Sequence, residues 1–238
     1  IRRVLWDWRA EAMIYQGNAV SVQLLDDGIA ELKFDLQGES VNKFDRATLE
    51  DLSKATEALK GNDQVKGIVV TSGKKVFIVG ADITEFGKPP VGPSLPEVID
   101  TIEASDKPVV AAIHGTALGG GLETAMAAHY RVGDPGSRYG LPEVKLGLLP
   151  GAGGTQRLPR VTGAQKALEM MTSGDMIGAD DHGERITRQI PPFVGYPSFE
   201  VSAKVLEYLK LPLVADFISR FSRPESRIDL TDDHIEDG

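Results

Sequence analysis

A glycine-rich stretch that joins an apolar strand to a helix is the feature that most constrains this chain. Residues 109–113 are a short apolar run, which is typical of a strand covered on both faces. Glycines follow at positions 115, 119, 120 and 121, and a helical pattern begins at Gly120. A glycine-lined helix start leaves backbone N–H groups open to a ligand. The stretch therefore predicts a strand, a turn and a helix with an anion-binding end.

Two acids accompany this helix start. Glu123 falls in the first turn, and Glu143 follows further along in the segment 141–144. Because Glu123 lies three residues beyond Gly120, its carboxylate is expected on the same face as the Gly120 N–H. Backbone N–H groups can stabilise an oxyanion, and acids beside them can transfer protons at the same site. The plainer interpretations are a favourable charge in a first helical turn for Glu123 and an exposed loop acid for Glu143.

The rest of the chain alternates expected strands with expected helices. Alternating apolar and polar residues on both sides of Asp27 and Gly28 predict a β-hairpin with one buried face. Continuous apolar runs predict buried strands, and apolar residues at helical spacing predict helices. The hairpin strands are expected at 20–24 and 30–36, buried strands at 65–71 and 109–113, and helices at 49–59, 98–102 and 120–128. This alternation predicts an α/β fold built in layers.

Four motifs, in this order, give the chain a resemblance to a known family. They are Phe77-Ile78-Val79-Gly80-Ala81-Asp82-Ile83, Gly115-Thr116-Ala117-Leu118-Gly119-Gly120-Gly121-Leu122-Glu123, Leu141-Pro142-Glu143-Val144-Lys145-Leu146-Gly147 and Pro150-Gly151-Ala152-Gly153-Gly154-Thr155-Gln156-Arg157-Leu158-Pro159-Arg160. Over about residues 13–178 the chain strongly resembles the crotonase (enoyl-CoA hydratase/isomerase) superfamily. Residues 13–86 are most similar to the hydratase domain that opens bacterial multifunctional fatty acid oxidation proteins. The resemblance implies a crotonase-like spiral of ββα units with C-terminal helices.

The resemblance also assigns roles to residues. It makes the backbone N–H groups of Val79 and Gly120 the donors that stabilise the oxyanion of a thioester enolate. Glu123 and Glu143 would hold one water between them, one removing its proton and the other helping to deliver a proton to the α-carbon. Substrate contacts are implied for the flanking residues Gly80, Ala81, Asp82, Ile83, Gly119 and Gly121.

The implied activity is that of an enoyl-CoA hydratase, which adds water across the 2,3 double bond of a trans-2-enoyl-CoA and gives a 3-hydroxyacyl-CoA. Family members with only one of the two acids tend to be isomerases, so the presence of both favours hydration. An isomerase or a thioester hydrolase of the same fold remains an alternative, as does an inactive oligomerisation or binding module. Coenzyme A is part of the substrate, and no separate cofactor is expected.

Several residues also have plainer interpretations. The run 119–121 alone would suit a tight turn for helix packing, and Asp82 suits a helix N-cap as well as a ligand contact. His114 is expected to be structural, and Arg157 and Arg160 are expected to form helix-terminal pairs. No dinucleotide fingerprint, phosphate loop or serine-esterase elbow is present.

Composition narrows the classes of partner. A net charge of -9 disfavours a nucleic-acid surface, which needs clustered Lys and Arg. The absence of cysteine excludes disulfides, thiolate catalysis and Cys-based metal sites, and the spacing of His129 and His182 suggests no metal. No apolar run reaches the roughly 18 residues of a membrane span. A cytoplasmic protein that binds an acyl-CoA thioester is expected.

The extent of the resemblance sets the expected domain organisation. Residues 1–12 are expected to be a leader or an expression remnant, and residues 13–178 the crotonase-like core. Residues 179–228 depart from the family and are expected to be a divergent helical region, followed by an acidic tail over 229–238. Because the family forms trimers or dimers of trimers through its C-terminal helices, a homo-oligomer is expected, with apolar residues over 199–221 as the contact.

Overall fold

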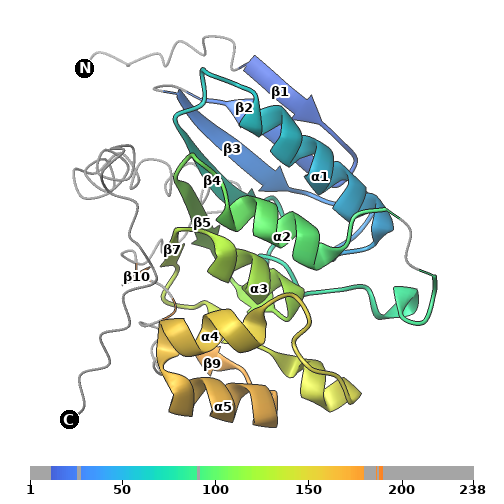
Figure 1. The fold of residues 1–238 in the computed structure, drawn as a ribbon, viewed down its shortest axis with the longest axis vertical. Coiled ribbons are helices and arrows are strands. Elements are labelled where there is room, and N and C mark those ends of the chain that lie inside the picture. Colours follow the sequence, from blue (N-terminus) through green and yellow to red (C-terminus); the bar gives the residue numbers. More distant parts are fainter. Residues whose placement is uncertain (1–11, 26–27, 90–91, 180–185, 187, 190–238) are drawn as a thin grey trace, which may run out of the picture.

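The computed structural model describes residues 12–25, 28–89, 92–179 and 186, and the backbone of 188–189. In these ranges the chain forms two sheets, and α1, α2 and α3 lie side by side across one face of the larger sheet (Figure 1). The helices are α1 (Arg46–Lys60), α2 (Leu95–Glu103), α3 (Gly120–Ala127), α4 (Gly154–Thr162) and α5 (Ala164–Ser173), with 3-10 turns η2 (Ile83–Glu85) and η3 (Pro142–Leu146). The expected helices over 199–221 and the acidic tail lie outside the described residues.

The larger sheet has seven strands in the order β1-β2-β3-β4-β5-β7-β10. Its strands are β1 (Ala12–Gln16), β2 (Val20–Leu24), β3 (Ile29–Phe34), β4 (Gly67–Ser72), β5 (Val109–Ile113), β7 (Tyr130–Gly133) and β10 (Arg188–Gln189). The expected hairpin is β2 and β3, with Val20 opposite Phe34, and the strands from β3 onward run parallel. Strand β1 was not among the expected strands. Ala12, assigned to a leader, pairs with Leu24 and therefore belongs to the sheet.

A second layer of short strands repeats along the chain. After a strand of the larger sheet, the chain crosses to a short extended segment and returns through a helix. These segments pair in succession: Phe44 with Ala81, Ile78 with Ala117, β6 (Thr116–Leu118) with β8 (Arg138–Gly140), and β8 with β9 (Ile177–Gly178). Each turn is thus a strand, a short strand and a helix, which confirms the expected spiral of ββα units.

The helices begin in two different ways. The Asp45 carboxylate caps α1 by accepting from the Thr48 N–H at 2.7 Å, and Ser94 and Glu97 form a capping box at α2. No side chain caps α3, which begins at Gly120 after Gly119. The first N–H groups of α3 are therefore left for other acceptors. In the described part of the chain, no helix combines the length and apolar character needed to cross a membrane.

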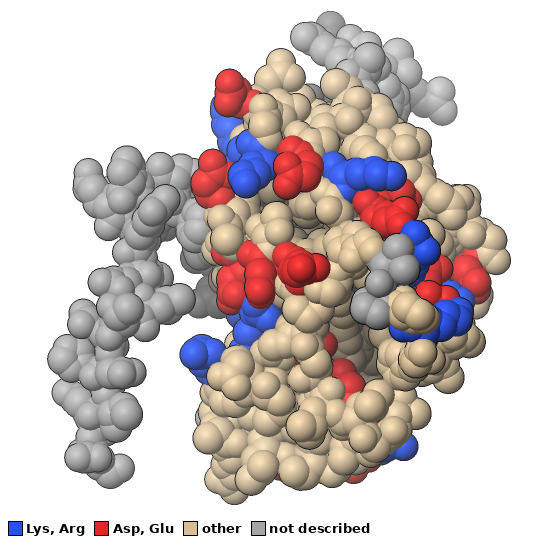
Figure 2. Space-filling model, turned by 45° about the vertical axis from the view of Figure 1, so that its right-hand side comes forward, with Lys and Arg blue, Asp and Glu red and all other residues tan. Residues whose placement is uncertain are grey.

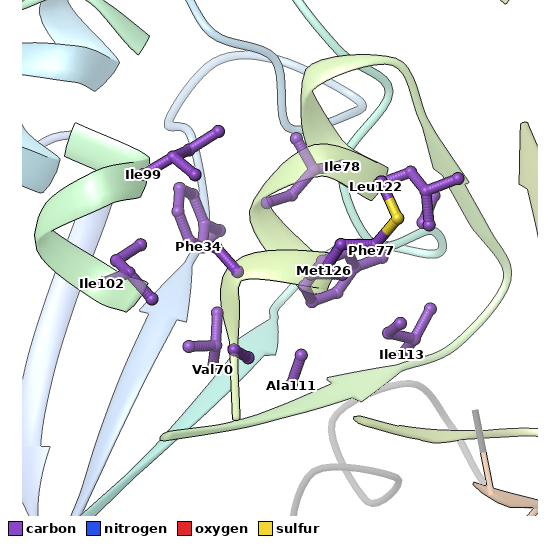
Figure 3. Close-up of a cluster of buried hydrophobic side chains, with 14 of the residues drawn as sticks. Phe34, Val70, Phe77, Ile78, Ile99, Ile102, Ala111, Ile113, Leu122 and Met126 are labelled. Atoms are coloured by element: carbon purple, nitrogen blue, oxygen red, sulfur yellow. The ribbon is translucent and has the colours of Figure 1, made fainter. Parts of the chain in front are cut away.

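The main core lies between the larger sheet and the helices that cover it. Side chains from α2 and α3 point toward strands β3, β4 and β5, and the second layer adds two more from the segment before Val79 (Figure 3). The labelled members are Phe34, Val70, Phe77, Ile78, Ile99, Ile102, Ala111, Ile113, Leu122 and Met126. Their burial holds α3 and the 77–82 segment as fixed supports.

Candidate active site

The motifs recognised in the sequence converge on the first turn of α3. A Cβ placed on Gly80 would lie 3.6 Å from the Gly120 nitrogen, so the first two motifs are in contact. A Cβ placed on Gly119 would lie 3.1 Å from Oε1 of Glu143, which belongs to the third motif. The fourth motif reaches Glu123 through backbone N–H groups. Figure 2 shows a hollow on this side of the molecule, with acidic atoms visible inside it.

Glu123 is held rigidly inside the protein. Its side chain is on α3 and the residue is 2% exposed. The N–H groups of Ala152 and Gly154 both donate to Oε1, each at 2.8 Å. Burial raises the pKa of Glu123, while the two N–H groups and the charge of Arg157 oppose that rise. One carboxylate oxygen is therefore fixed by the backbone, and no described residue donates to the other.

Glu143 is held less completely. It lies in η3, and its Oε2 atom is buried without a hydrogen-bond partner in the described structure. Burial raises the pKa of Glu143, its own backbone N–H opposes that rise, and the neighbouring charge of Glu123 adds to it. A buried oxygen without a donor is costly unless it is protonated or meets a water or ligand. The geometry thus gives two coupled carboxyl groups with pKa values shifted in the same direction.

The structure contradicts the expected role of the Val79 N–H. This group donates to the carbonyl oxygen of Asn42 at 3.0 Å, so it is already used inside the protein. The Asp82 N–H likewise donates to the Phe44 carbonyl at 2.8 Å. The expectation was wrong because the partner strand, residues 42–44, is distant in the sequence and has no local signature.

The neighbouring N–H of Ala81 takes the place assigned to Val79. Ala81 forms a parallel bridge with Phe44, made by the Gly80 carbonyl and the Asp82 N–H. In such a bridge the central residue turns its own N–H and carbonyl to the opposite side. That side is occupied by the start of α3, and the N–H groups of Ala81 and Gly120 have no acceptor among the described residues. The available pair of donors is therefore Ala81 and Gly120.

The three glycines at the helix start serve different purposes. Gly119 has a φ of +50°, which disfavours other residues, and its missing Cβ admits the Glu143 carboxylate. A Cβ on Gly120 would lie 2.6 Å from Cδ2 of Leu95, and one on Gly121 would collide with the Ile78 carbonyl. Packing against the Ile78 backbone thus requires glycine at 121, whereas at 120 the nearest atom is the end of a flexible side chain, so close approach of a ligand to Gly120 remains a prediction. A substrate contact at Gly119 or Gly121 remains a prediction.

Asp82 has the N-cap role that the sequence left open. Its side chain accepts from the N–H of Thr84 at 2.9 Å and pairs with Lys43 at 3.0 Å. The Thr84 N–H and hydroxyl, followed by Lys43, lower the pKa of Asp82 to about 2. Ile83, the next residue, is 62% exposed. Both side chains lie at the surface beside Ala81, and their contact with coenzyme A remains a prediction.

Arg157 supports the loop that donates to Glu123. Its guanidinium donates to the Ala152 carbonyl at 2.8 Å and pairs with Glu103 at 2.6 Å and with Asp100 at 3.0 Å. The expected ion pairing is therefore present, but it also holds a segment of the site. Arg160, by contrast, is exposed and donates to the Gln156 carbonyl.

Neither of two hollows in the described structure is lined by Glu123 or Glu143, although Ala152, which donates to Glu123, lines the smaller one. A cavity of about 480 Å³ between α1, α2 and the sheet is lined by none of the expected site residues, and one of about 260 Å³ lies between α2 and α4. His114 donates from Nε2 to the Lys74 carbonyl at 2.7 Å, as a structural residue would. Within the described ranges, no cluster of three or more His, Asp or Glu side chains could hold a metal ion.

Comparison with known proteins identifies the family of this chain. The enoyl-CoA hydratase/isomerase family model matches residues 25–186. The fatty acid oxidation complex subunit alpha of Pseudomonas syringae pv. tomato is 53% identical over 178 residues, 71% of this chain and 25% of that protein. The same subunit of Acinetobacter baumannii is 54% identical over 168 residues, 67% of this chain and 23% of that protein. The chain thus spans about a quarter of the length of these curated relatives.

Solved structures share the fold. The enoyl-CoA hydratase of Bacillus anthracis superimposes with a TM-score of 0.71 at 26% identity, covering 85% of this chain and 77% of that one. DspI of Pseudomonas aeruginosa gives a TM-score of 0.70 at 28% identity, covering 87% of this chain and 77% of that one. The fold is therefore crotonase-like, and the chain belongs to the enoyl-CoA hydratase/isomerase family.

Proposed function

We propose that this chain is an enoyl-CoA hydratase, which adds water across the 2,3 double bond of a trans-2-enoyl-CoA. The observation that carries the proposal is a pair of acids, the buried Glu123 and the half-buried Glu143, beside the N–H groups of Ala81 and Gly120, which have no acceptor among the described residues. Family membership and the hydratase among the similar structures support it. Two acids suit hydration because one proton must leave water while another reaches carbon.

The backbone donors polarise the thioester. As water attacks C3, negative charge moves through C2 to the thioester oxygen, and the N–H groups of Ala81 and Gly120 stabilise that oxyanion. Each such donor typically contributes about 3 kcal/mol to the transition state. The positive end of the α3 dipole adds to this effect, since Gly120 is its first residue.

The two acids divide the proton transfers. Glu123 is the general base, because two N–H donors and Arg157 favour its charged form. Glu143 is the general acid, because burial and the charge of Glu123 both favour its protonated form. Glu123 accepts a proton from water as the hydroxyl bonds to C3, and Glu143 gives its proton to C2. Exchange with solvent then restores both acids, and the reaction consumes only water and the enoyl thioester.

The remaining expectations belong to the same proposal. The segment Ala81, Asp82 and Ile83 contacts the coenzyme A part of the substrate, and the reaction needs no separate cofactor. A homo-oligomer, a trimer or a dimer of trimers, is expected from the family, as is a cytoplasmic location. Since the chain spans about a quarter of the fatty acid oxidation subunits, the complex that those names mention is a further possibility for a longer protein.

A direct assay tests the function. Crotonyl-CoA loses its conjugated thioester absorbance on hydration, so the purified chain should remove that band in water. Mass spectrometry of the product should give a 3-hydroxyacyl-CoA. A product with a shifted double bond would support the isomerase alternative, and free coenzyme A would support thioester hydrolysis. Unchanged substrate, with or without binding, would reject the enzyme proposal.

A further inference from the structure

Asn42 connects three segments behind the proposed oxyanion hole. The residue is 1% exposed and lies in the second layer, between β3 and α1. Its Oδ1 accepts from the N–H of Leu36 at 3.0 Å. Its Nδ2 lies 3.1 Å from the Phe34 carbonyl, 2.9 Å from the Ser72 hydroxyl and 3.1 Å from the Phe77 carbonyl. The amide thus holds the ends of β3 and β4 and the start of the 77–82 segment together.

The main chain of Asn42 continues the same connection. Its carbonyl accepts from the Val79 N–H at 3.0 Å, and two residues later Phe44 bonds to Gly80 and Asp82. These bonds orient residues 79–82 so that the Ala81 N–H faces the start of α3. Because Gly80 has a φ of +102° and no side chain of its own to hold it, the segment depends on such outside bonds.

We propose that Asn42 is a positioning residue for the oxyanion hole, an inference that rests on the proposed hydratase function. Its side chain fixes the entry to the 77–82 segment, its carbonyl fixes Val79, and together they aim the Ala81 N–H beside that of Gly120. Asn42 does not touch the substrate. It acts by holding the Ala81 N–H at the position where the thioester oxygen becomes charged.

The chemistry of the site requires an amide at this position. The Leu36 N–H needs an acceptor, while the carbonyls of Phe34 and Phe77 need donors. Asparagine provides both on a short side chain. Aspartate has the same shape but no donor, so it would place a charged oxygen against two carbonyl oxygens and push the 77–82 segment away.

The first test compares Asn42→Asp with a matched exchange elsewhere. Asn42→Asp should lower kcat about a hundredfold, which is typical of losing one oxyanion-hole donor, while KM stays within about threefold. The control is Asp51→Asn, since Asp51 also joins distant segments, accepting from Ala19 at 2.8 Å and Tyr15 at 2.9 Å near β1. The control should leave kcat within about twofold. Equal kcat losses in both variants would reduce Asn42 to a structural role and overturn the proposal.

The polarisation of the bound substrate's carbonyl can be measured independently of the stability of each variant. The infrared carbonyl band of bound butyryl-CoA should move to lower wavenumber in the wild type, and this shift should shrink in Asn42→Asp. Ser72→Ala removes one partner of the amide, together with the bonds of the Ser72 hydroxyl to the Val76 carbonyl and the Lys74 N–H, and introduces no charge, so it is the milder variant if Asn42→Asp does not fold. It should lower kcat about threefold to tenfold. An unchanged carbonyl band and unchanged kcat in Ser72→Ala and Asn42→Asp would reject the proposal.

Hydrogen exchange separates this inference from the function itself. In Asn42→Asp, or in Ser72→Ala, the peptide covering 77–82 should exchange faster than in Asp51→Asn at equal global stability. If the wild type hydrates crotonyl-CoA but the peptide exchanges equally in all variants, the positioning role fails alone. If the wild type is inactive, the proposed function fails, and faster exchange would still support Asn42 as the residue that orders the segment.

Discussion

Glu123 and Glu143 meet at one site, yet the two segments that carry them hold their carboxylates differently. Glu123 projects from α3 and its Oε1 accepts from two backbone N–H groups at 2.8 Å. Glu143 projects from the 3-10 turn η3, and its buried Oε2 meets no donor in the described structure. Burial raises the pKa of both acids, but donors oppose the rise more fully at Glu123.

This difference explains how two identical side chains can have opposite roles. Hydrogen-bond donors favour the charged form of a carboxyl group, whereas burial without donors favours the neutral form. The α3 site therefore suits a base, and the η3 site suits an acid, because the pKa of Glu143 is raised with fewer donors to oppose the rise. Because each charge affects the other, the pair titrates as a unit with two apparent pKa values.

The largest expected effect comes from removing either acid. Glu123→Gln and Glu143→Gln should each lower kcat by about a hundredfold to ten-thousandfold, because each removes one proton transfer. Acyl-CoA binding should change far less. The double replacement should cost much less than the product of the single effects, since the acids act together. Stopped assays with crotonyl-CoA measure all three variants.

Glu31→Gln is the matched control for these replacements. Glu31 is also buried, at 5% exposed, but it accepts from the Thr71 hydroxyl on the larger sheet. This variant should keep kcat within about twofold. Hydration that survives both single replacements within a few-fold would contradict the assignment of the two acids.

The sequence predicted much of this arrangement. Apolar periodicity gave the hairpin, the buried strands and α1, because those signals are local. The motifs that contain Glu123 and Glu143 were identified together, although the contact between them depends on the spiral. Prediction failed at Val79, where the choice of donor depends on pairing with residues 42–44. The same pairing hides Asn42, whose side-chain partners lie up to 35 positions away in the chain.

A smaller effect is expected from the support of Glu123. Arg157→Lys keeps the charge but loses the planar fork that reaches the Ala152 carbonyl, Asp100 and Glu103 together. The loop that donates to Glu123 should loosen, and kcat should fall about threefold to tenfold. Arg160→Lys, one turn further along α4, is the matched control and should have no effect. Equal kcat values in the two variants would show that the loop needs no such support.

The smallest effect concerns stability, and it should differ in size between the two acids. Burial raises the folded-state pKa of Glu143 above its unfolded value, so the folded state binds its proton more tightly. That contribution to stability is complete below the unfolded pKa and is lost as the pH rises through the folded pKa. Glu143→Gln mimics the neutral form, so it should unfold at a higher temperature than the wild type in alkaline buffer.

The gain in Tm for Glu143→Gln should appear at a pH above the raised pKa of Glu143, where the wild-type carboxyl is charged. Well below the unfolded pKa the difference should vanish, because the wild-type carboxyl is then protonated in both states. Glu123→Gln should gain less at every pH, since it gives up charge-assisted bonds from Ala152 and Gly154. Calorimetry of both variants across this pH range measures the two curves. A greater gain for Glu123→Gln than for Glu143→Gln would reverse the assignment of base and acid, because the charged form would then cost more stability at Glu123 than at Glu143.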